Sequence, residues 1–281
     1  MKKYPAIFFP WSAYKSDSFR RLSAARPTDA PKKRMKSPAM KNPALPLRVL
    51  LLQALFILAF PTLSSTAPPP FFPHGEKLTF QIRWSFLLAG HATLEVRQGE
   101  IIDGETASHF VMTTRTTPFI DTFYKVRDVI ESYTSQDMHH SLRYIKKQQG
   151  KTKRDIIVTF DWKKNQARYA NFGKPKTPIP IPPGTIDPLA ALYFIRQSDF
   201  NHGPLIERPV TDGKYNEIGK AKILRREEVH VPAGIFQTIV VQPNLAKVRG
   251  VFEKDKNSSM LLWITDDRSR RLVKVASKVK V

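Results

Sequence analysis

The 281-residue sequence predicts a mainly β protein, in which a single domain forms a highly curved antiparallel sheet or a β-barrel-like one and carries one short packed helix. Two observations support this fold class. After residue 76, about ten or eleven segments alternate apolar and polar residues, as half-buried strands do. Only one segment, near residue 187, places apolar residues at helical spacing. With so many strands, strong curvature or closure protects sheet edges that would otherwise aggregate.

The predicted strands follow one another through short turns. The first has an apolar face made of Leu78, Phe80, Ile82 and Trp84, and residues 87–90, "LLAG", are expected to turn the chain into a second strand that ends near residue 97. Further strands are expected over residues 108–116, 126–134, 142–148, 154–161, 166–172, 218–231, 235–243, 258–267 and 271–281. In the last of these, the valines at 273, 275, 279 and 281 are expected to face opposite the lysines at 274, 278 and 280.

The one predicted helix covers residues 187–197. Asp187 is a residue type favoured at the N-cap, and Pro188 suits the first helical position because its missing N–H would have no partner there. Leu189, Leu192 and Tyr193 recur at i, i+3 and i+4, so this face is expected to dock on the sheet. Downstream, "VPAG" at 231–234 predicts a hairpin turn.

The most apolar run of the chain, Arg48 to Phe60, predicts export. About twelve apolar positions match the 7–15-residue core of a signal peptide better than the ~20 residues of a membrane-spanning helix. Ser65 and Ala67 fit the small-x-small rule for cleavage, and Met35 or Met40 each begins a conventional basic n-region.

These features divide the chain into four parts: a mis-annotated or disordered basic leader (1–39), a signal peptide (40–67), a proline-rich linker (68–75) and the β-rich domain (76–281). In the alternative interpretation, the apolar run is a short uncleaved anchor that keeps the protein membrane-associated. Both interpretations place the domain beyond the inner membrane, and the periplasm is the expected compartment.

The net charge of +22 is unevenly distributed, since residues 1–48 contain twelve Lys or Arg against Asp17 and Asp29. The remaining +12 suits partners with anionic surfaces, such as lipid or lipopolysaccharide, although a basic surface without a dedicated partner is the simpler interpretation of this charge. An envelope protein is the other partner considered, and no specific nucleic acid is indicated. The absence of cysteine excludes disulfides, thiol catalysis and Cys-ligated zinc.

Five segments together resemble one family, the bacterial envelope family known as domain of unknown function 3108: Gly75–Val96, Tyr124–Tyr133, Ile186–Arg196, Val231–Pro243 and Leu261–Val279. The resemblance covers nearly all of residues 75–281. It implies an exported, β-rich, periplasmic protein of Gram-negative bacteria, and it supplies no established activity or catalytic residue. The long N-terminal extension and an end at Val281, earlier than is usual in the family, depart from its pattern.

The candidate ligand-binding residues are Trp84, Arg127, Glu131, Tyr193 and Trp263. On a strand, Arg127 and Glu131 share a face that Asp128 does not, so these three charges favour cross-strand ion pairs over one shared site. The aromatic residues of this set, with Phe119, Phe123 and Tyr124, are expected either to line a hydrophobic cavity or to fill the core.

No catalytic, metal-binding or cofactor-binding motif is present. The adjacent His139 and His140 would point to opposite faces of a strand, so no metal site is expected. Asp266-Asp267 is typical of a charged turn, and "GKYNEIGK" at 213–220 does not stand between a strand and a helix as a phosphate-binding loop would.

Two hypotheses of function follow. In the first, a non-enzymatic envelope protein binds an apolar or amphipathic ligand, or an envelope partner. In the second, a hydrolase or polysaccharide-modifying enzyme uses carboxylates such as Asp128, Glu131, Asp161 or Asp187. An integral outer-membrane barrel is disfavoured, because lysines and arginines alternate on the expected outer faces of several strands.

Overall fold

The computed structural model describes residues 5–13, 71–84, 86–150, 153–245, 248 and 260–278, and for 5–13 and 278 the backbone alone. Within these ranges it contains two helices, α2 (Pro118–Tyr124) and α3 (Pro188–Gln197), and a series of strands. The strands are β1 (Pro5–Ala13), β2 (Lys77–Trp84), β3 (Leu87–Arg97), β4 (Ile101–Ile102), β5 (Glu105–Thr116), β6 (Val126–Ser135), β7 (Ser141–Gly150), β8 (Arg154–Asp161), β9 (Gln166–Asn171), β10 (Lys174–Pro175), β11 (Ile179–Pro180), β12 (Leu205–Thr211), β13 (Asn216–Val231), β14 (Gly234–Asn244), β15 (Met260–Thr265) and β16 (Leu272–Lys278).

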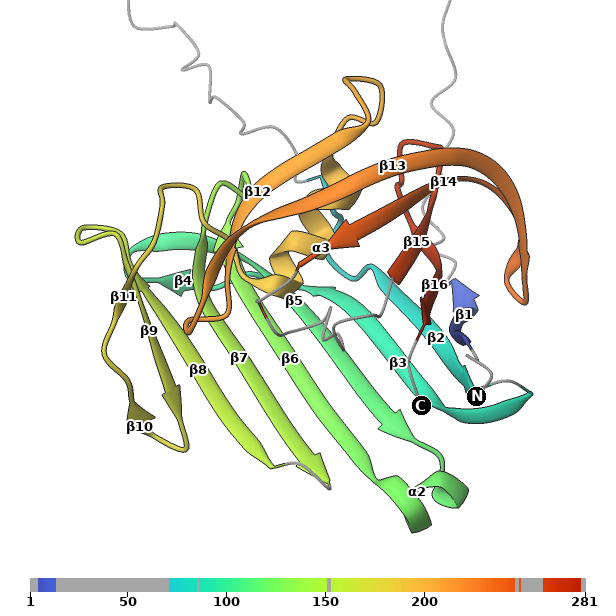
Figure 1. The fold of residues 1–281 in the computed structure, drawn as a ribbon, viewed down its shortest axis with the longest axis horizontal. Helices are drawn as coiled ribbons and strands as arrows, with labels where there is room; N and C mark the ends of the chain where they lie inside the picture. The colour runs from blue at the N-terminus through green and yellow to red at the C-terminus, as the bar shows by residue number, and fades with distance from the viewer. Residues whose placement is uncertain are drawn as a thin grey trace, which may run out of the picture. The chain divides into compact units, whose positions relative to one another are not determined.

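The strands form one sheet in the order β10-β9-β8-β7-β6-β5-β3-β2-β1-β16-β15-β14-β13-β12, with every neighbouring pair antiparallel. The sheet curls so that β12–β14 cross over the concave side of β5–β8, and α3 lies between the two parts (Figure 1). This confirms the predicted fold class, a highly curved antiparallel sheet. The prediction of a single helix is wrong, because α2 is a second one.

The expected hairpin of β2 and β3 forms, but its turn is earlier than predicted. Residues 87–90 belong to β3 and pair with β2 and β5. Gly90 is required there by a close approach of two backbones, since a Cβ at this position would lie 2.4 Å from the carbonyl oxygen of Arg115. The glycine that predicted a turn therefore marks tight strand packing.

The helix α3 begins as predicted, with Asp187 as N-cap and Pro188 at the first helical position. The carboxylate of Asp187 accepts hydrogen bonds from the backbone N–H groups of Leu189 and Ala190, both at 2.9 Å. It also accepts hydrogen bonds from the hydroxyl groups of Ser132 on β6 and Ser141 on β7, both at 2.6 Å. The cap that starts the helix thus also attaches it to the sheet.

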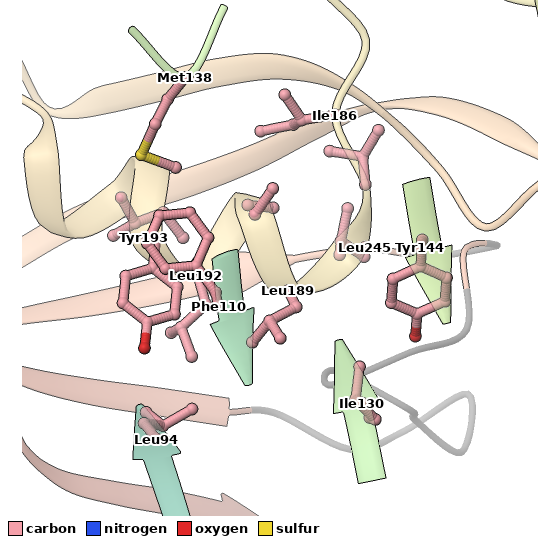
Figure 2. Close-up of a cluster of buried hydrophobic side chains, with 14 of the residues drawn as sticks. Leu94, Phe110, Ile130, Met138, Tyr144, Ile186, Leu189, Leu192, Tyr193 and Leu245 are labelled. Atoms are coloured by element: carbon pink, nitrogen blue, oxygen red, sulfur yellow. The ribbon is translucent and has the colours of Figure 1, made fainter. Parts of the chain in front are cut away.

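Nearly the whole of α3 is buried against the concave face of the sheet. Leu189, Leu192 and Tyr193 are at most 3% exposed, and the ring of Tyr193 stacks on Phe110 of β5 with centroids 4.0 Å apart. Figure 2 shows these side chains facing Leu94 of β3 and the neighbouring strands. The main core is therefore the space between α3 and the curved sheet.

Two predicted turns are confirmed. The "VPAG" segment joins β13 to β14, and Gly234 has φ +134°. Asp267 lies in the turn between β15 and β16, where its Oδ1 accepts hydrogen bonds from the Ser269 hydroxyl and the Thr265 hydroxyl at 2.6 and 2.8 Å. Although burial raises the pKa of Asp267, these bonds outweigh it and hold the pKa below its ordinary value.

The predicted alternation of the last strand is wrong in one respect. Val273 packs in an outer cluster with Trp263, whereas Val275 packs against the main core. A register irregularity is the cause: Trp263 faces Lys274, but the next residue, Ile264, faces Leu272. The extra residue at 273 reverses the face on which the following side chains lie. Residues 279–281 lie outside the described ranges.

The strand β1 falls within the segment predicted as a leader. It pairs with β2 on one side and β16 on the other, for example Phe8 with Ile82 and with Val275. If residues 1–39 are removed with the signal peptide, the edges of β2 and β16 lose this pairing. Export of the chain and the boundaries of the leader and signal peptide stay predictions, since 14–70 lie outside the described residues.

Candidate functional site

A polar cavity lies on the concave side of the sheet, against the middle of β7, the start of β8 and the strand β9. Its volume is ≈ 200 Å³. Strands β7–β9 supply one wall, and the connection between β12 and β13 supplies the other. The lining residues are Tyr144, Lys146, Arg154, Ile156, Tyr169, Asp212, Lys214 and Tyr215. We call this cavity the cationic pocket.

Strand alternation aims the wall residues into the pocket. Tyr144 and Lys146 are two residues apart on β7, and Arg154 and Ile156 are two apart on β8, so each pair shares a face. Antiparallel register places Lys146 opposite Ile156. Lys146 is only 3% exposed, so a cation is held within the wall of the domain.

The opposite wall is a short loop, Thr211–Asn216, with its own hydrogen bonds. The Asp212 Oδ1 accepts hydrogen bonds from the backbone N–H groups of Lys214 and Tyr215 at 2.9 and 3.0 Å, which is the geometry of an Asx turn. Gly213 has φ +81°, and a Cβ there would lie 2.8 Å from a methyl of Val158 on β8. Only glycine lets the loop press this closely on the sheet.

This loop presents a cation to the pocket. The ammonium group of Lys214 lies 4.3 Å from the centroid of the Tyr169 ring, within cation–π range. Lys146, Arg154 and Lys214 outnumber Asp212 among the charged lining residues. Cations with tyrosine hydroxyls suit an anionic group such as a phosphate or carboxylate.

Sequence analysis missed this pocket, although two signals were present. Tyr144 and Lys146 follow the period of the apolar face of β7, which places a lysine on the core side. Lys214 and Tyr215 belong to the "GKYNEIGK" segment, in which two lysines stand close to a tyrosine. In the pocket these residues contribute side chains, so the backbone cradle of a phosphate-binding loop is not needed.

The five predicted ligand-binding residues are not brought together. Tyr193 is buried in the main core, where burial raises the pKa of its hydroxyl above its ordinary value. Trp84 is 48% exposed at the end of β2. Trp263 lies in the outer cluster, donates to Glu227 at 2.6 Å and packs under the ammonium group of Lys274 at 4.5 Å.

Arg127 and Glu131 do share one face of β6, as predicted, but each has its own partner. Arg127 donates to Asp121 of α2, and this bond lowers the pKa of that carboxyl. The Glu131 Oε2 lies 3.0 Å from His109 Nε2 on β5, and the hydroxyl of Tyr133 donates to it at 3.2 Å. The Arg127–Asp121 ion pair is local and joins β6 to α2, and the Glu131–His109 hydrogen bond crosses from β6 to β5.

The carboxylates considered for a hydrolase also lie apart. Asp128 accepts a hydrogen bond from Gln148 on the concave face, whereas Glu131 is on the other face of the same strand. Asp161 pairs with Lys164 at 3.8 Å at the exposed end of β8, and Asp187 is the buried helix cap. The strands and the helix therefore do not position these four carboxylates as an acid and base pair.

Metal-binding groups and membrane-spanning helices are absent from the part of the chain that the structure describes. No three His, Asp or Glu side chains gather there as a metal site would require. His139 and His140 lie in the turn before β7, and the His140 Nε2 is 3.1 Å from a Glu105 carboxylate oxygen. None of the described helices is long and apolar enough to cross a bilayer.

Comparison with known proteins gives a family but no activity. A family model described as "Protein of unknown function (DUF3108)" matches residues 79–281 and confirms the family resemblance. No curated protein matches the chain. One similar solved structure is the crystal structure of a β-barrel-like protein of domain of unknown function DUF1849 from Brucella abortus. It has a TM-score of 0.40 and 8% identity, with 73% of this chain and 87% of that chain covered.

Proposed function

This chain belongs to the DUF3108 family of proteins of unknown function, and we propose that it is an exported, non-enzymatic envelope protein that binds the anionic head group of an amphipathic ligand in the cationic pocket. The observation that carries the proposal is the pocket itself, in which three cations and three tyrosines face a space of ≈ 200 Å³.

The pocket dimensions limit what enters it. Sites for drug-sized ligands occupy about 300–1,000 Å³, so a pocket of ≈ 200 Å³ accommodates a head group and leaves an attached chain outside. Phosphate and carboxylate oxygens would accept charge-assisted hydrogen bonds from Lys146, Arg154 and Lys214. The ring faces of the tyrosines and the side chain of Ile156 supply an apolar border where the attached chain begins.

A ligand enclosed at the centre of the curved sheet has less support. The space there is filled by α3, whose Leu189 and Tyr193 are fully buried. The apolar cavity between α3 and β12–β14 has a volume of only ≈ 20 Å³, which is about enough for one water molecule. We therefore place the ligand at the cationic pocket instead of among the aromatic residues of the core.

Phosphate binding tests the pocket directly. Inorganic phosphate is expected to raise the midpoint of thermal unfolding of the full chain in a concentration-dependent way, since it binds only the folded state. Lys214→Gln removes one charge-assisted contact and is expected to weaken the phosphate affinity roughly tenfold or more.

The matched control is Lys220→Gln, which removes an exposed lysine that pairs with Glu207 away from the pocket. It should leave the phosphate response unchanged. Equal phosphate responses in the two variants and the unmodified chain would place the anion elsewhere. Native mass spectrometry of the purified protein would identify any amphipathic molecule that co-purifies. If the protein responds to phosphate but no such molecule co-purifies, the ligand of the pocket is a small anion.

N-terminal sequencing of protein recovered from a periplasmic extract tests export. We expect the first residue to lie between Ser64 and Phe72. Phe72 itself is 5% exposed and packs on Tyr193 with ring centroids 5.1 Å apart, so the cut should precede it. Recovery of a cytosolic protein that starts at Met1 would contradict both the export and the envelope assignment.

A further inference from the structure

One end of the sheet carries exposed aromatic side chains, which we call the aromatic tip: Trp84, Phe86, Phe119, Phe123 and Tyr124. Their exposed fractions lie between 48% and 90%, with Phe86 the most exposed. The expectation that Trp84, Phe119, Phe123 and Tyr124 line a cavity or fill the core is therefore wrong. Exposed apolar area of this kind is unfavourable in water unless another surface covers it.

Two segments separated in sequence form the tip. Trp84 and Phe86 lie at the β2–β3 turn, and the other three aromatics belong to α2. The backbone N–H of Thr117, at the start of α2, donates to the carbonyl of Ala89 at 3.0 Å. The turn and the helix are thus held at the same end of the sheet, where α2 follows β5 (Figure 1).

Polar contacts anchor α2, and its rings are left outside. Asp121 pairs with Arg127 and accepts a hydrogen bond from the hydroxyl of Thr116. The same hydroxyl oxygen of Thr116 accepts a hydrogen bond from the backbone N–H of Val126 at 2.9 Å. No residue of α2 is buried. Phe119 and Phe123 are one helical turn apart and contact each other, with centroids 5.7 Å apart.

Exposed cations lie at the same end of the sheet as the rings. Arg115 at the end of β5 and Lys125 after α2 are both exposed, and so is Lys153 at the start of β8. The β7–β8 connection lies beside Lys125, since a Cβ at Gly150 would be 2.0 Å from the Lys125 carbonyl oxygen. Aromatic rings and exposed lysine and arginine side chains at one end of a domain match the interfacial region of a bilayer with anionic head groups.

We propose that the aromatic tip docks the protein on an anionic phospholipid surface. The rings enter the head-group region, while Arg115, Lys125 and Lys153 contact lipid phosphates. A flat apolar protein interface would account for the rings but not for the cations, whereas a bilayer accounts for both. This inference does not depend on the cationic pocket, which has different lining residues and is tested by free phosphate.

The absence of cysteine makes a site-specific test possible. Phe86→Cys and Phe123→Cys are each labelled with an environment-sensitive fluorophore in the full chain, and Ile101→Cys serves as the matched control. Ile101 is 72% exposed and lies on the connection at the other end of β3 and β5. Vesicles of phosphatidylglycerol or of phosphatidylcholine contain a spin-labelled lipid that quenches only labels in the head-group region.

We expect quenching at positions 86 and 123 with phosphatidylglycerol vesicles, little quenching at 101, and a marked decrease with phosphatidylcholine or high salt. Reversing two charges, Arg115→Glu with Lys125→Glu, should weaken vesicle binding by at least about tenfold. Vesicle binding through the N-terminal apolar run alone would quench all three labels to the same extent, and that result would overturn the proposal. Equal quenching with the two lipids, or no quenching with either, would also overturn the proposal. In that case a protein partner would be the remaining candidate to cover the tip.

Discussion

Replacing Arg196 with methionine is expected to lower the free energy of unfolding by about 3–5 kcal/mol, because it leaves the carboxylate of Glu76, which is only 11% exposed, without its partner. The side chain of Arg196 is fully buried, and its guanidinium contacts the Glu76 carboxylate through two N–O pairs at 2.8 and 2.9 Å. It also donates to the carbonyl of Arg270 at 2.8 Å and lies over the ring of Phe72 at 4.6 Å. One side chain therefore joins the start of the domain, α3 and the β15–β16 turn.

Urea denaturation monitored by circular dichroism would measure this loss. The control is Arg226→Met, which removes a partner of Asp266 in a pair whose arginine is 52% exposed, and it should cost less than about 1 kcal/mol. Adding Glu76→Met to Arg196→Met should recover part of the stability, since the uncompensated charge is then gone. Equal effects of Arg196→Met and Arg226→Met would show that the buried pair has no special role.

The second large effect is expected at Asp187, where alanine should lower the free energy of unfolding by about 2–4 kcal/mol. The substitution removes the acceptor for two helical N–H groups and for the hydroxyls of Ser132 and Ser141. All of these groups lie in the interior, so water cannot replace the carboxylate. The substitution Asp187→Asn keeps the cap oxygen and should cost clearly less than alanine.

The pH dependence of the unfolding free energy distinguishes two effects of Asp187, its hydrogen bonds as the helix cap and the cost of burying its negative charge. Burial raises the pKa of Asp187 above its ordinary value of 3.8, and the four accepted hydrogen bonds only partly oppose this. A raised pKa in the folded state means that the unfolding free energy of the unmodified protein decreases as the pH rises from about 3.8 through that pKa. Asp187→Asn lacks this decrease.

The stability of Asp187→Asn relative to the unmodified protein should therefore increase from acid to neutral pH. Urea unfolding curves of both proteins at about pH 3.5, 5 and 7, recorded at one ionic strength, would measure this difference in unfolding free energy. A relative stability that falls with rising pH would mean that the hydrogen bonds outweigh burial and that the folded protein favours the charged carboxylate.

Much of α3 could be predicted from local sequence, because a helix start depends on residues close together in the chain. Asp187 and Pro188 marked its beginning, and the spacing of Leu189, Leu192 and Tyr193 marked its buried face. Arg196 follows the same spacing, three residues after Tyr193, and so falls on that face. Its partner Glu76 is 120 residues away, and no local pattern connects the two.

The candidate sites could not be predicted in the same way. The cationic pocket combines three adjacent strands with a loop more than forty residues further along the chain. The predicted residues Trp84, Arg127 and Trp263 are chemically suitable, but Trp84 is exposed at the end of β2, Arg127 pairs with Asp121 of α2, and Trp263 lies in the outer cluster. The aromatic tip escaped prediction because period and composition do not show whether a phenylalanine is covered by a distant segment.

By itself, the sequence determined the fold class and the family, through strand alternation and segments spread along the domain. It also determined the turns at 231–234 and at Asp267 and the start of α3, since each of these depends on residues within a few positions of one another. The tertiary structure decided which side chains meet. It made Gly90 a point of close strand contact, reversed the face of β16 after Val273, and buried Arg196 against Glu76. These outcomes depend on register and on the curvature of the whole sheet, which bring together residues far apart in the chain.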